Sequence, residues 1–378
     1  MYDETLKLLR KLAHSALRHF ATGEALQKLF STTVPKLEVE VAKTAGKPVD
    51  PKDLISLLLY NTFSEMCFGK RFDMHDPKVL QSMKLIDELG QNIGLGLPED
   101  VFSILRYVPY KKRDIIRETI KNKEFFMEQI GDHKDTHIQG EMTDIFHMFL
   151  NAQEKAMAED NNMEKLSDEH LLWTIIDMFG ASIQTSTETI YWALALMTEH
   201  PEIADRVRKE IDDVIGRDRI PVIEDRRSVP YAEATLYEVL RYASIAPVLL
   251  PHATTCDTTL RGHVIPKGTT VIMNVYSMHF DPREWKDPEN FCPEHFLAEN
   301  GTVRDHPPSF LPFGAGRRGC LGEAVGKAIL FLIFTWFMQN YTFSKVPGKE
   351  SESLTNMITK VNAGRLLVPY EIMINKRE

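Results

Sequence analysis

Apolar residues recur at helical spacing in the first segment of the chain, from Glu4 to Leu29. The apolar positions are Leu6, Leu9, Leu12, Ala13, Leu17 and Phe20. The basic residues of the opposite face are Lys7, Arg10, Lys11 and Arg18. Intervals of three and four residues predict an amphipathic helix, and solvation alone accounts for its basic face.

The longest periodic segment predicts a central helix from Ser167 to His200. Ser167 suits the N-cap position, and Pro201 ends the apolar pattern. At about 1.5 Å per residue, such a helix crosses a whole domain. Near its middle lies FGASIQTSTET, an island of small and hydroxyl side chains within an apolar pattern. This island indicates a close helix contact or a local kink.

Three further helices are predicted after the central one. They are Pro201 to Ile215, Tyr231 to Tyr242 and Glu323 to Asn340. β-branched runs between residues 246 and 280, divided by glycine-containing turns, predict a small antiparallel sheet. The tail from Leu354 to Ile374 predicts further strands, and residues 50–153 predict mostly helix. The fold class is therefore mainly α, with small antiparallel β-sheets.

Composition places the chain among ordinary globular proteins. Its 378 residues are 43% hydrophobic and 26% charged, which is enough to bury a large core. Without a linker, repeat or low-complexity tract, residues 1–378 are expected to form a single domain. The net charge of −9 argues against nucleic acid as a partner. Four scattered cysteines fit a reducing compartment, and no segment predicts a membrane anchor.

Cys320 stands in the stretch FLPFGAGRRGCLGE, just before a strongly apolar helical segment. The helix dipole and the adjacent Arg317 and Arg318 are expected to favour the thiolate form. Four glycines remove side chains that would keep a large flat ligand away from the backbone. The stretch therefore predicts a buried thiolate that faces a bulky cofactor.

Three other interpretations of this stretch compete. The spacing G-x-G-x-x-G suits a dinucleotide-binding loop. Pro312 interrupts the strand that such a loop needs, however, and no acidic residue lies between Glu323 and Glu350 to hold a ribose. A nucleophilic cysteine with a histidine partner stays open from the sequence alone. A purely structural cysteine would leave the two neighbouring arginines unexplained.

Five residues of the stretch fit the pattern F-x-x-G-x-R-x-C-x-G. They are Phe313, Gly316, Arg318, Cys320 and Gly322. The pattern is the haem-binding signature of the cytochrome P-450 superfamily, which this chain resembles. The resemblance implies haem b with its iron ligated by the Cys320 thiolate, a ligand that favours O–O cleavage. It also implies that Arg318, Arg10 and His252 hold the haem propionates.

The middle of the central helix resembles the family pattern A/G-G-x-D/E-T. Ala181 is expected to line the substrate pocket, and Thr185 matches the threonine that helps to deliver protons for dioxygen activation. Ser182 replaces the glycine and Gln184 replaces the acid. Because an amide does not exchange a proton as a carboxyl group does, a relay through Gln184 needs water. These changes leave open a haem-thiolate isomerase or lyase that does not use O2.

Glu238 and Arg241 match the family motif E-x-x-R, which by itself is an ordinary helical ion pair. In the family this motif locks the core together with an arginine from a P-E-R-F segment. Here the segment reads PEHF, so His295 replaces that arginine. A histidine forms hydrogen bonds but does not offer the bidentate fork of a guanidinium. These three residues are expected to have a structural role.

Other residues around these motifs were assigned by position. Further substrate-pocket residues implied by the resemblance are Ala246, Val248, Leu249 and Val361. Cys67 is interpreted as a core cysteine. Cys256, His263, Cys292 and His295 raise the alternative of a zinc site, but only one C-x-x-H pair has suitable spacing.

The segments EATLYEVLRYASIAPVLLPH and KGTTVIMNVYSMHFDPREW look most like the microsomal steroid 17α-hydroxylase/17,20-lyase type. The resemblance implies hydroxylation of a lipophilic, steroid-like substrate with O2 and NADPH-derived electrons. The implied electron donor is NADPH-cytochrome P-450 reductase, with cytochrome b5 as a second donor. The implied location is the cytoplasmic face of the endoplasmic reticulum membrane. Since the resemblance starts at the first helix, we expect an N-terminally incomplete chain, soluble or peripheral. It is expected to lack the family's anchor, first helices and most of the first sheet. A non-catalytic haem-binding fragment is the alternative.

Overall fold

A computed structural model shows that helices build most of the chain. It describes residues 4–22, 24–72, 76–92, 123–136, 140, 143–158, 166–356, 358–359 and 364–378. The helices are α1 (Glu4–Thr22), α2 (Glu24–Ala42), α3 (Lys52–Phe68), α4 (Pro77–Asn92), α7 (Lys123–Thr136), α8 (Ile145–Ala158), α9 (Asp168–Glu199), α10 (Pro201–Val214), α11 (Pro230–Ala243), α12 (Val275–His279) and α13 (Glu323–Asn340). The strands are β1 (His252–Ala253), β2 (Thr258–Leu260), β3 (His263–Ile265), β4 (Thr270–Val271), β5 (Tyr341–Lys345), β6 (Ile358–Thr359), β7 (Leu366–Leu367) and β8 (Ile372–Lys376). The predicted fold class, mainly α with small antiparallel sheets, is confirmed.

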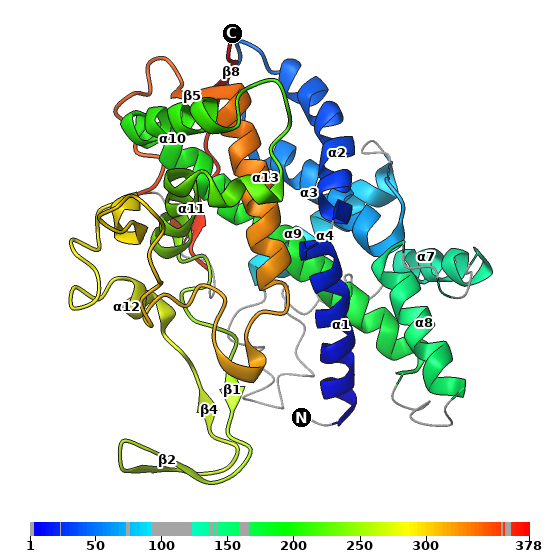
Figure 1. Ribbon diagram of the computed structural model, residues 1–378. Helices are drawn as coiled ribbons and strands as arrows, with labels where there is room; N and C mark the ends of the chain where they lie inside the picture. The colour runs from blue at the N-terminus through cyan, green and yellow to red at the C-terminus, as the bar shows by residue number, and fades with distance from the viewer. Residues whose placement is uncertain are drawn as a thin grey trace, which may run out of the picture.

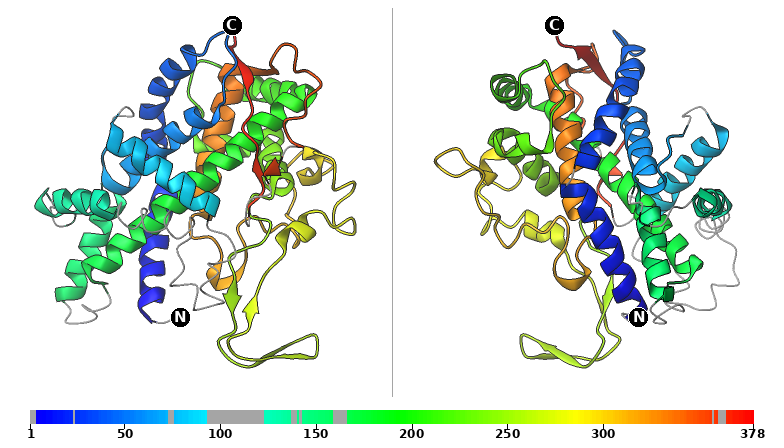
Figure 2. Two further views of the ribbon diagram at one scale, coloured as in Figure 1. Left: turned by 180° about the vertical axis from the view of Figure 1, so that it is seen from behind. Right: turned by 45° about the vertical axis from the view of Figure 1, so that its right-hand side comes forward.

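The helices pack into one body, and two of the strand pairs lie at its opposite ends. Figure 1 shows β5 and β8 near the C-terminus at one end, while the hairpin of β2 and β3 projects from the other. Figure 2 shows α9 running through the body, between α3 and α8 on one side and α11 on the other. Within the described ranges, no helix combines the length and apolar character needed to cross a membrane.

Helix α9 is the central element that the pattern predicted. The side chain of Ser167 caps its first turn by accepting the backbone N–H of His170 at 3.4 Å. The second half is buried without a break from Ser186 to Thr198, because α3, α11 and α13 all pack against this helix. The buried second half of this helix fixes the positions of the elements around it.

Helix α13 begins and ends where the apolar pattern predicted, at Glu323 and Asn340. From Ala328 to Gln339 every residue is buried, which explains why the segment carries no polar face. The chain continues directly into β5, which pairs with β8 in antiparallel register from Tyr341↔Lys376 to Lys345↔Ile372. The residues that precede α13 in the sequence, including Cys320, are therefore anchored to the core by this strongly apolar helix.

The first predicted helix differs from the structure at its end. The prediction of one helix from Glu4 to Leu29 is wrong, because α1 ends at Thr22 and α2 begins at Glu24. A glycine separates them in the sequence, and glycine has a low helix propensity. In α2, Leu26, Phe30 and Val34 are buried, so the second helix has its own core-facing stripe.

The antiparallel sheet predicted between residues 246 and 280 is confirmed as two strand pairs. Strand β1 pairs with β4, and β2 pairs with β3 around Arg261 and Gly262. Both turn residues have positive φ, +49° and +84°. The predicted strands of the C-terminal tail are β6, β7 and β8, of which β6 pairs with β7.

Candidate functional site

Cys320 lies in a glycine-rich turn that leads directly into α13. Its backbone N–H donates to the carbonyl of Phe313 at 2.8 Å, which closes the turn. Gly314 and Gly316 have φ of +72° and +71°, a left-handed conformation that glycine adopts without steric cost. Cys320 is exposed as a residue, whereas protein atoms surround much of its thiol group.

A cavity of about 520 Å³ lies between α1 and this turn. Helix α1 contributes Lys7, Arg10, Lys11 and His14. The turn contributes Gly314, Ala315, Gly316, Arg317, Gly319, Cys320 and Leu321. Arg10 Nη2 donates to the carbonyl oxygen of Gly319 at 2.9 Å, which fastens α1 to the residue beside the cysteine. The resulting wall of the cavity is basic.

The electrostatic setting of Cys320 corrects one expectation. Burial raises the pKa of its thiol above the ordinary value, and Glu323 adds to the rise. The backbone N–H of Gly322 and the guanidinium of Arg10 oppose the shift but do not reverse it. The expectation that the loop by itself favours the thiolate is therefore not met, because loss of water around the thiol disfavours the anion more than the Gly322 N–H and Arg10 favour it. A coordinated metal cation removes this barrier, since a coordinating thiol loses its proton outright.

The predicted proton-delivery residues lie in the middle of α9. Ala181 and Thr185 are exposed although the helix is central, so this face of the helix is not packed into the described core. Thr185 Oγ1 donates to the carbonyl of Ala181 at 2.7 Å, and Ser182 Oγ donates to the carbonyl of Met178 at 2.5 Å. Gln184 is half-buried. Both hydroxyl groups thus donate their hydrogen bond to the helix backbone, and their oxygen lone pairs can still accept one.

The segment after α11 lies against the cysteine turn. A Cβ atom added to Gly314 would come within 3.1 Å of Leu249 Cδ1, so Leu249 and the turn are in close contact. The backbone of Val248 pairs with that of Asn274 in an isolated antiparallel β-bridge. His252 begins β1, paired with Val271.

For the remaining residues predicted for the substrate pocket and the haem propionates, the structure gives a position in the fold but no contact with the cysteine turn. Ala246 is half-buried before that segment, and Arg318 is exposed at the end of a short 3-10 helix, Gly316–Arg318. Val361 lies outside the described residues.

The structure brings Glu238, Arg241 and His295 together in the core. Both guanidinium nitrogens of Arg241 that face Glu238 donate to its carboxylate, at 2.8 and 2.6 Å, and neither side chain is exposed. His295 Nδ1 lies 3.2 Å from each carboxylate oxygen, while Nε2 lies 2.5 Å from the carbonyl of Lys286. These contacts occupy His295 fully, which argues against the zinc alternative that used this residue.

His279 is a residue of this region that the sequence analysis missed. Its carbonyl accepts from Arg241 Nη1 at 2.8 Å, and its ring accepts from the backbone N–H of Leu311 at 3.1 Å. The residue is fully buried and connects the Glu238–Arg241 pair to the start of the cysteine loop. In the sequence it is an isolated histidine after a short apolar run, and no motif marks it.

The accessible Cys320, the left-handed glycines and the basic wall fit a large flat ligand that carries carboxylates. A family model described as "Cytochrome P450" matches residues 1–370. The chain belongs to the cytochrome P450 family. P450 membership implies a haem held through a cysteine thiolate and electrons supplied by a redox partner. Cys320 is the cysteine at the position of the family signature.

Curated P450 proteins of several types are similar to this chain. A steroid 17-alpha-hydroxylase/17,20 lyase of Oryzias latipes is 33% identical over 366 residues, 93% of this chain and 70% of the relative. Cytochrome P450 1A1 of Limanda limanda is 32% identical over 354 residues, 90% of this chain and 68% of the relative. Cytochrome P450 2U1 of Rattus norvegicus is 32% identical, with all of this chain and 71% of the relative covered. Similar identities to different P450 types establish the family and leave the substrate to be proposed.

Proposed function

We propose that this P450 is a haem-thiolate monooxygenase that hydroxylates a lipophilic, steroid-like substrate with O2 and NADPH-derived electrons. The observation that carries the proposal is the exposed Cys320, which is presented by a glycine turn at a basic cavity. Similarity to a steroid 17-alpha-hydroxylase/17,20 lyase supports the substrate class. Residues 1–378 are proposed to act as one domain, because α9 and α13 are shared by the whole body.

Cys320 is proposed to ligate haem iron, and the bound haem supplies the redox chemistry. Phe313, Gly316 and Gly322 shape the turn: a Cβ atom on Gly322 would lie 3.9 Å from the Cys320 sulfur. Arg10 and Arg318, with His252, are proposed to hold the propionates. Arg10 already reaches Gly319 beside the cysteine, so its guanidinium is positioned at the edge of the turn.

Thr185 is proposed to hold a water molecule for proton delivery. Because its hydroxyl proton is donated to Ala181, its oxygen is oriented to accept from water. Ala181 keeps this face of α9 open through its small side chain. The apolar residues Ala246, Val248 and Leu249 precede β1, and Leu249 contacts the cysteine turn. These residues are proposed to line the substrate pocket together with Val361.

Electron supply is proposed to come from NADPH-cytochrome P-450 reductase, with cytochrome b5 as a second donor. Three basic residues on α1 line the cavity, namely Lys7, Lys11 and His14. Their charge would be complementary to an acidic surface on the electron donor. Association with the cytoplasmic face of the endoplasmic reticulum membrane is proposed from the resemblance to microsomal relatives.

A haem-thiolate isomerase or lyase is the second candidate, and two residues favour it. Ser182 stands in place of the family's glycine, and Gln184 stands in place of the acid that relays protons. An enzyme of this kind converts an oxygenated lipid without consuming NADPH. Turnover of such a lipid in the absence of NADPH and reductase distinguishes it from the monooxygenase.

The reduced carbon monoxide difference spectrum of the expressed chain tests the cofactor assignment. We expect the Soret band of a thiolate-ligated haem in the wild type and its loss in Cys320→Ser. Cys256→Ser, which changes another exposed cysteine, should keep the band. A wild-type spectrum without the thiolate-type band overturns the proposal. NADPH-dependent hydroxylation of a steroid is then not expected either, because it requires the thiolate-ligated haem.

A further inference from the structure

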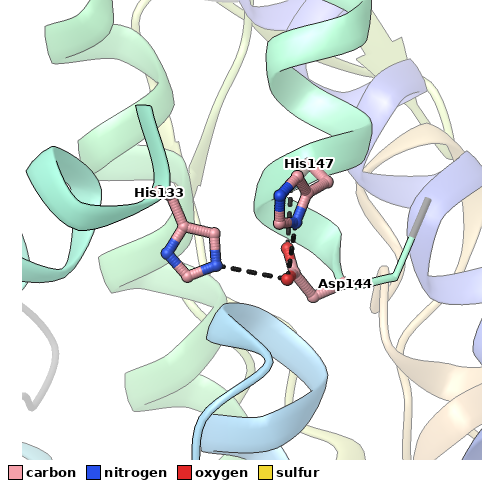
Figure 3. Close-up of side chains that lie close together, drawn as sticks. All are labelled: His133, Asp144 and His147. Carbon is pink, nitrogen blue, oxygen red and sulfur yellow. Dashed lines mark hydrogen bonds and ion pairs between the residues drawn. The ribbon is translucent and has the colours of Figure 1, made fainter. Parts of the chain in front are cut away.

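A second group of metal-ligating side chains lies on helices other than those that hold Cys320. His133 comes from the end of α7, Asp144 immediately precedes α8, and His147 lies in its first turn. Their exposed fractions are 4%, 1% and 8%. Figure 3 shows that the two imidazole rings approach the same carboxylate from different helices. Two helices therefore meet at a buried His–Asp–His cluster.

The distances within this cluster are close to those of a metal coordination shell. Asp144 Oδ2 lies 3.2 Å from His133 Nε2 and 2.7 Å from His147 Nδ1. All three ligand atoms lie within 4.8 Å of one another. Bonds of about 2.0–2.1 Å in a tetrahedral zinc site separate neighbouring ligand atoms by about 3.3 Å. The three atoms are therefore close enough together for one ion to be their common partner.

Local contacts hold the ligands in this arrangement. Asp144 Oδ1 accepts the backbone N–H of His147 at 2.8 Å, which caps α8 and leaves Oδ2 directed at the rings. The hydroxyl of Thr143 lies 3.1 Å from His147 Nδ1 and 3.4 Å from Asp144 Oδ2. Spacing of i and i+3 places Asp144 and His147 on one helix face. The contact through Oδ1 orients the carboxylate before an ion binds. The Thr143 hydroxyl lies against the ligand atoms themselves and would be displaced by the ion.

The surroundings of the cluster are closed and largely apolar. The rings of Phe68 and Phe146 lie 6.4 and 5.4 Å from the ring of His133. Gly69 packs so tightly that a Cβ atom there would lie 2.8 Å from Asp144 Oδ2. Burial of this kind suits a structural ion, and because the cluster supplies three ligands, a water molecule would fill the fourth tetrahedral position.

We propose that His133, Asp144 and His147 bind one divalent first-row metal ion, with zinc as the best fit to their nitrogen and oxygen donors. Imidazole and carboxylate are ordinary zinc ligands. The ion ties the end of α7 to the start of α8 and is independent of the haem bound at Cys320. Stabilisation of the fold is its role, because a ligand that binds only the folded state raises the free energy of unfolding.

Equilibrium dialysis against zinc, followed by elemental analysis of the full-length protein, tests the proposal. We expect one zinc equivalent in the wild type and none in Asp144→Asn or in His147→Gln. His263→Ala, which changes an exposed histidine on β3, should bind as much zinc as the wild type. Iron is measured in the same samples, so zinc at this cluster is distinguished from haem.

Misfolding of the variants does not obscure the result. Asparagine is as good an N-cap as aspartate, so Asp144→Asn keeps the start of α8. In the wild type, zinc should raise Tm, and this rise should vanish in Asp144→Asn but persist in His263→Ala. A wild-type Tm that zinc leaves unchanged, or equal zinc content in all four proteins, overturns the proposal and identifies a hydrogen-bonded cluster only.

Discussion

The ring of His279 accepts a hydrogen bond from the backbone N–H of Leu311 over 3.1 Å. Nδ1 of the same ring lies 3.2 Å from Ser244 Oγ. Since Nε2 serves as an acceptor, the ring must be neutral with its proton on Nδ1. A neutral histidine thus joins the Arg241 region to the segment that leads to Cys320.

Acid should weaken this connection. Burial lowers the pKa of His279 to about 4, and the charge of Arg241 adds to the effect. A histidine in the unfolded chain titrates near 6.5, so the unfolded state binds more protons between these values. The stabilising contribution, about 3 kcal/mol, is complete above pH ~6.5 and is lost as the pH falls toward 4.

Urea denaturation at a series of pH values measures this effect. The free energy of unfolding of His279→Gln should depend less on pH between about 6.5 and 4 than that of the wild type. His263→Ala, at an exposed position, should retain the wild-type slope. Identical slopes for His279→Gln and the wild type would show that His279 does not titrate with unfolding.

Removal of Glu238 should destabilise the protein strongly. Glu238→Ala leaves the fully buried Arg241 without its charge partner, and breaking a buried pair costs about 3–5 kcal/mol. Asp213→Ala is the matched control, since it breaks the exposed Lys209–Asp213 pair, which is worth about 0–1 kcal/mol. Thermal unfolding of both variants compares the two losses, and similar values would contradict a structural role for Glu238.

The fold could be predicted from the sequence where a single local pattern, such as an apolar run or a capping residue, determines the bounds of a helix. Helix α13 follows its apolar run from Glu323 to Asn340, and α9 lies between a capping Ser167 and Pro201. Tertiary contacts decided the remainder. The raised pKa of Cys320 depends on how the folded turn removes water from the thiol. The role of His279 depends on its contact with Leu311, which lies 32 residues away in the sequence. The cluster of His133, Asp144 and His147 likewise requires two helices to meet, and no spacing rule joins them.

The glycines of the cysteine turn should differ in their tolerance of alanine. Gly316→Ala places a side chain at φ +71° with free space around it, so it should cost about 1–2 kcal/mol of backbone strain. Gly314→Ala should cost more, because Leu249 lies 3.1 Å from the new Cβ atom. Gly180→Ala, within α9, adds a Cβ atom that would meet no described residue outside the helix backbone within 4 Å, and it should stabilise by up to about 1 kcal/mol. Equal unfolding free energies for Gly314→Ala and Gly316→Ala would contradict the contact with Leu249.

Gln184→Glu should increase the efficiency of oxygen use if the chain is a monooxygenase. A carboxyl group at this half-buried position of α9 exchanges protons with water, whereas the native amide does not. The ratio of hydroxylated product to NADPH consumed should therefore rise. Ser182→Gly, which also restores a family residue but adds no acid, serves as the matched control. A ratio unchanged in Gln184→Glu but raised in Ser182→Gly would move the limitation from proton supply to the shape of the helix beside Thr185.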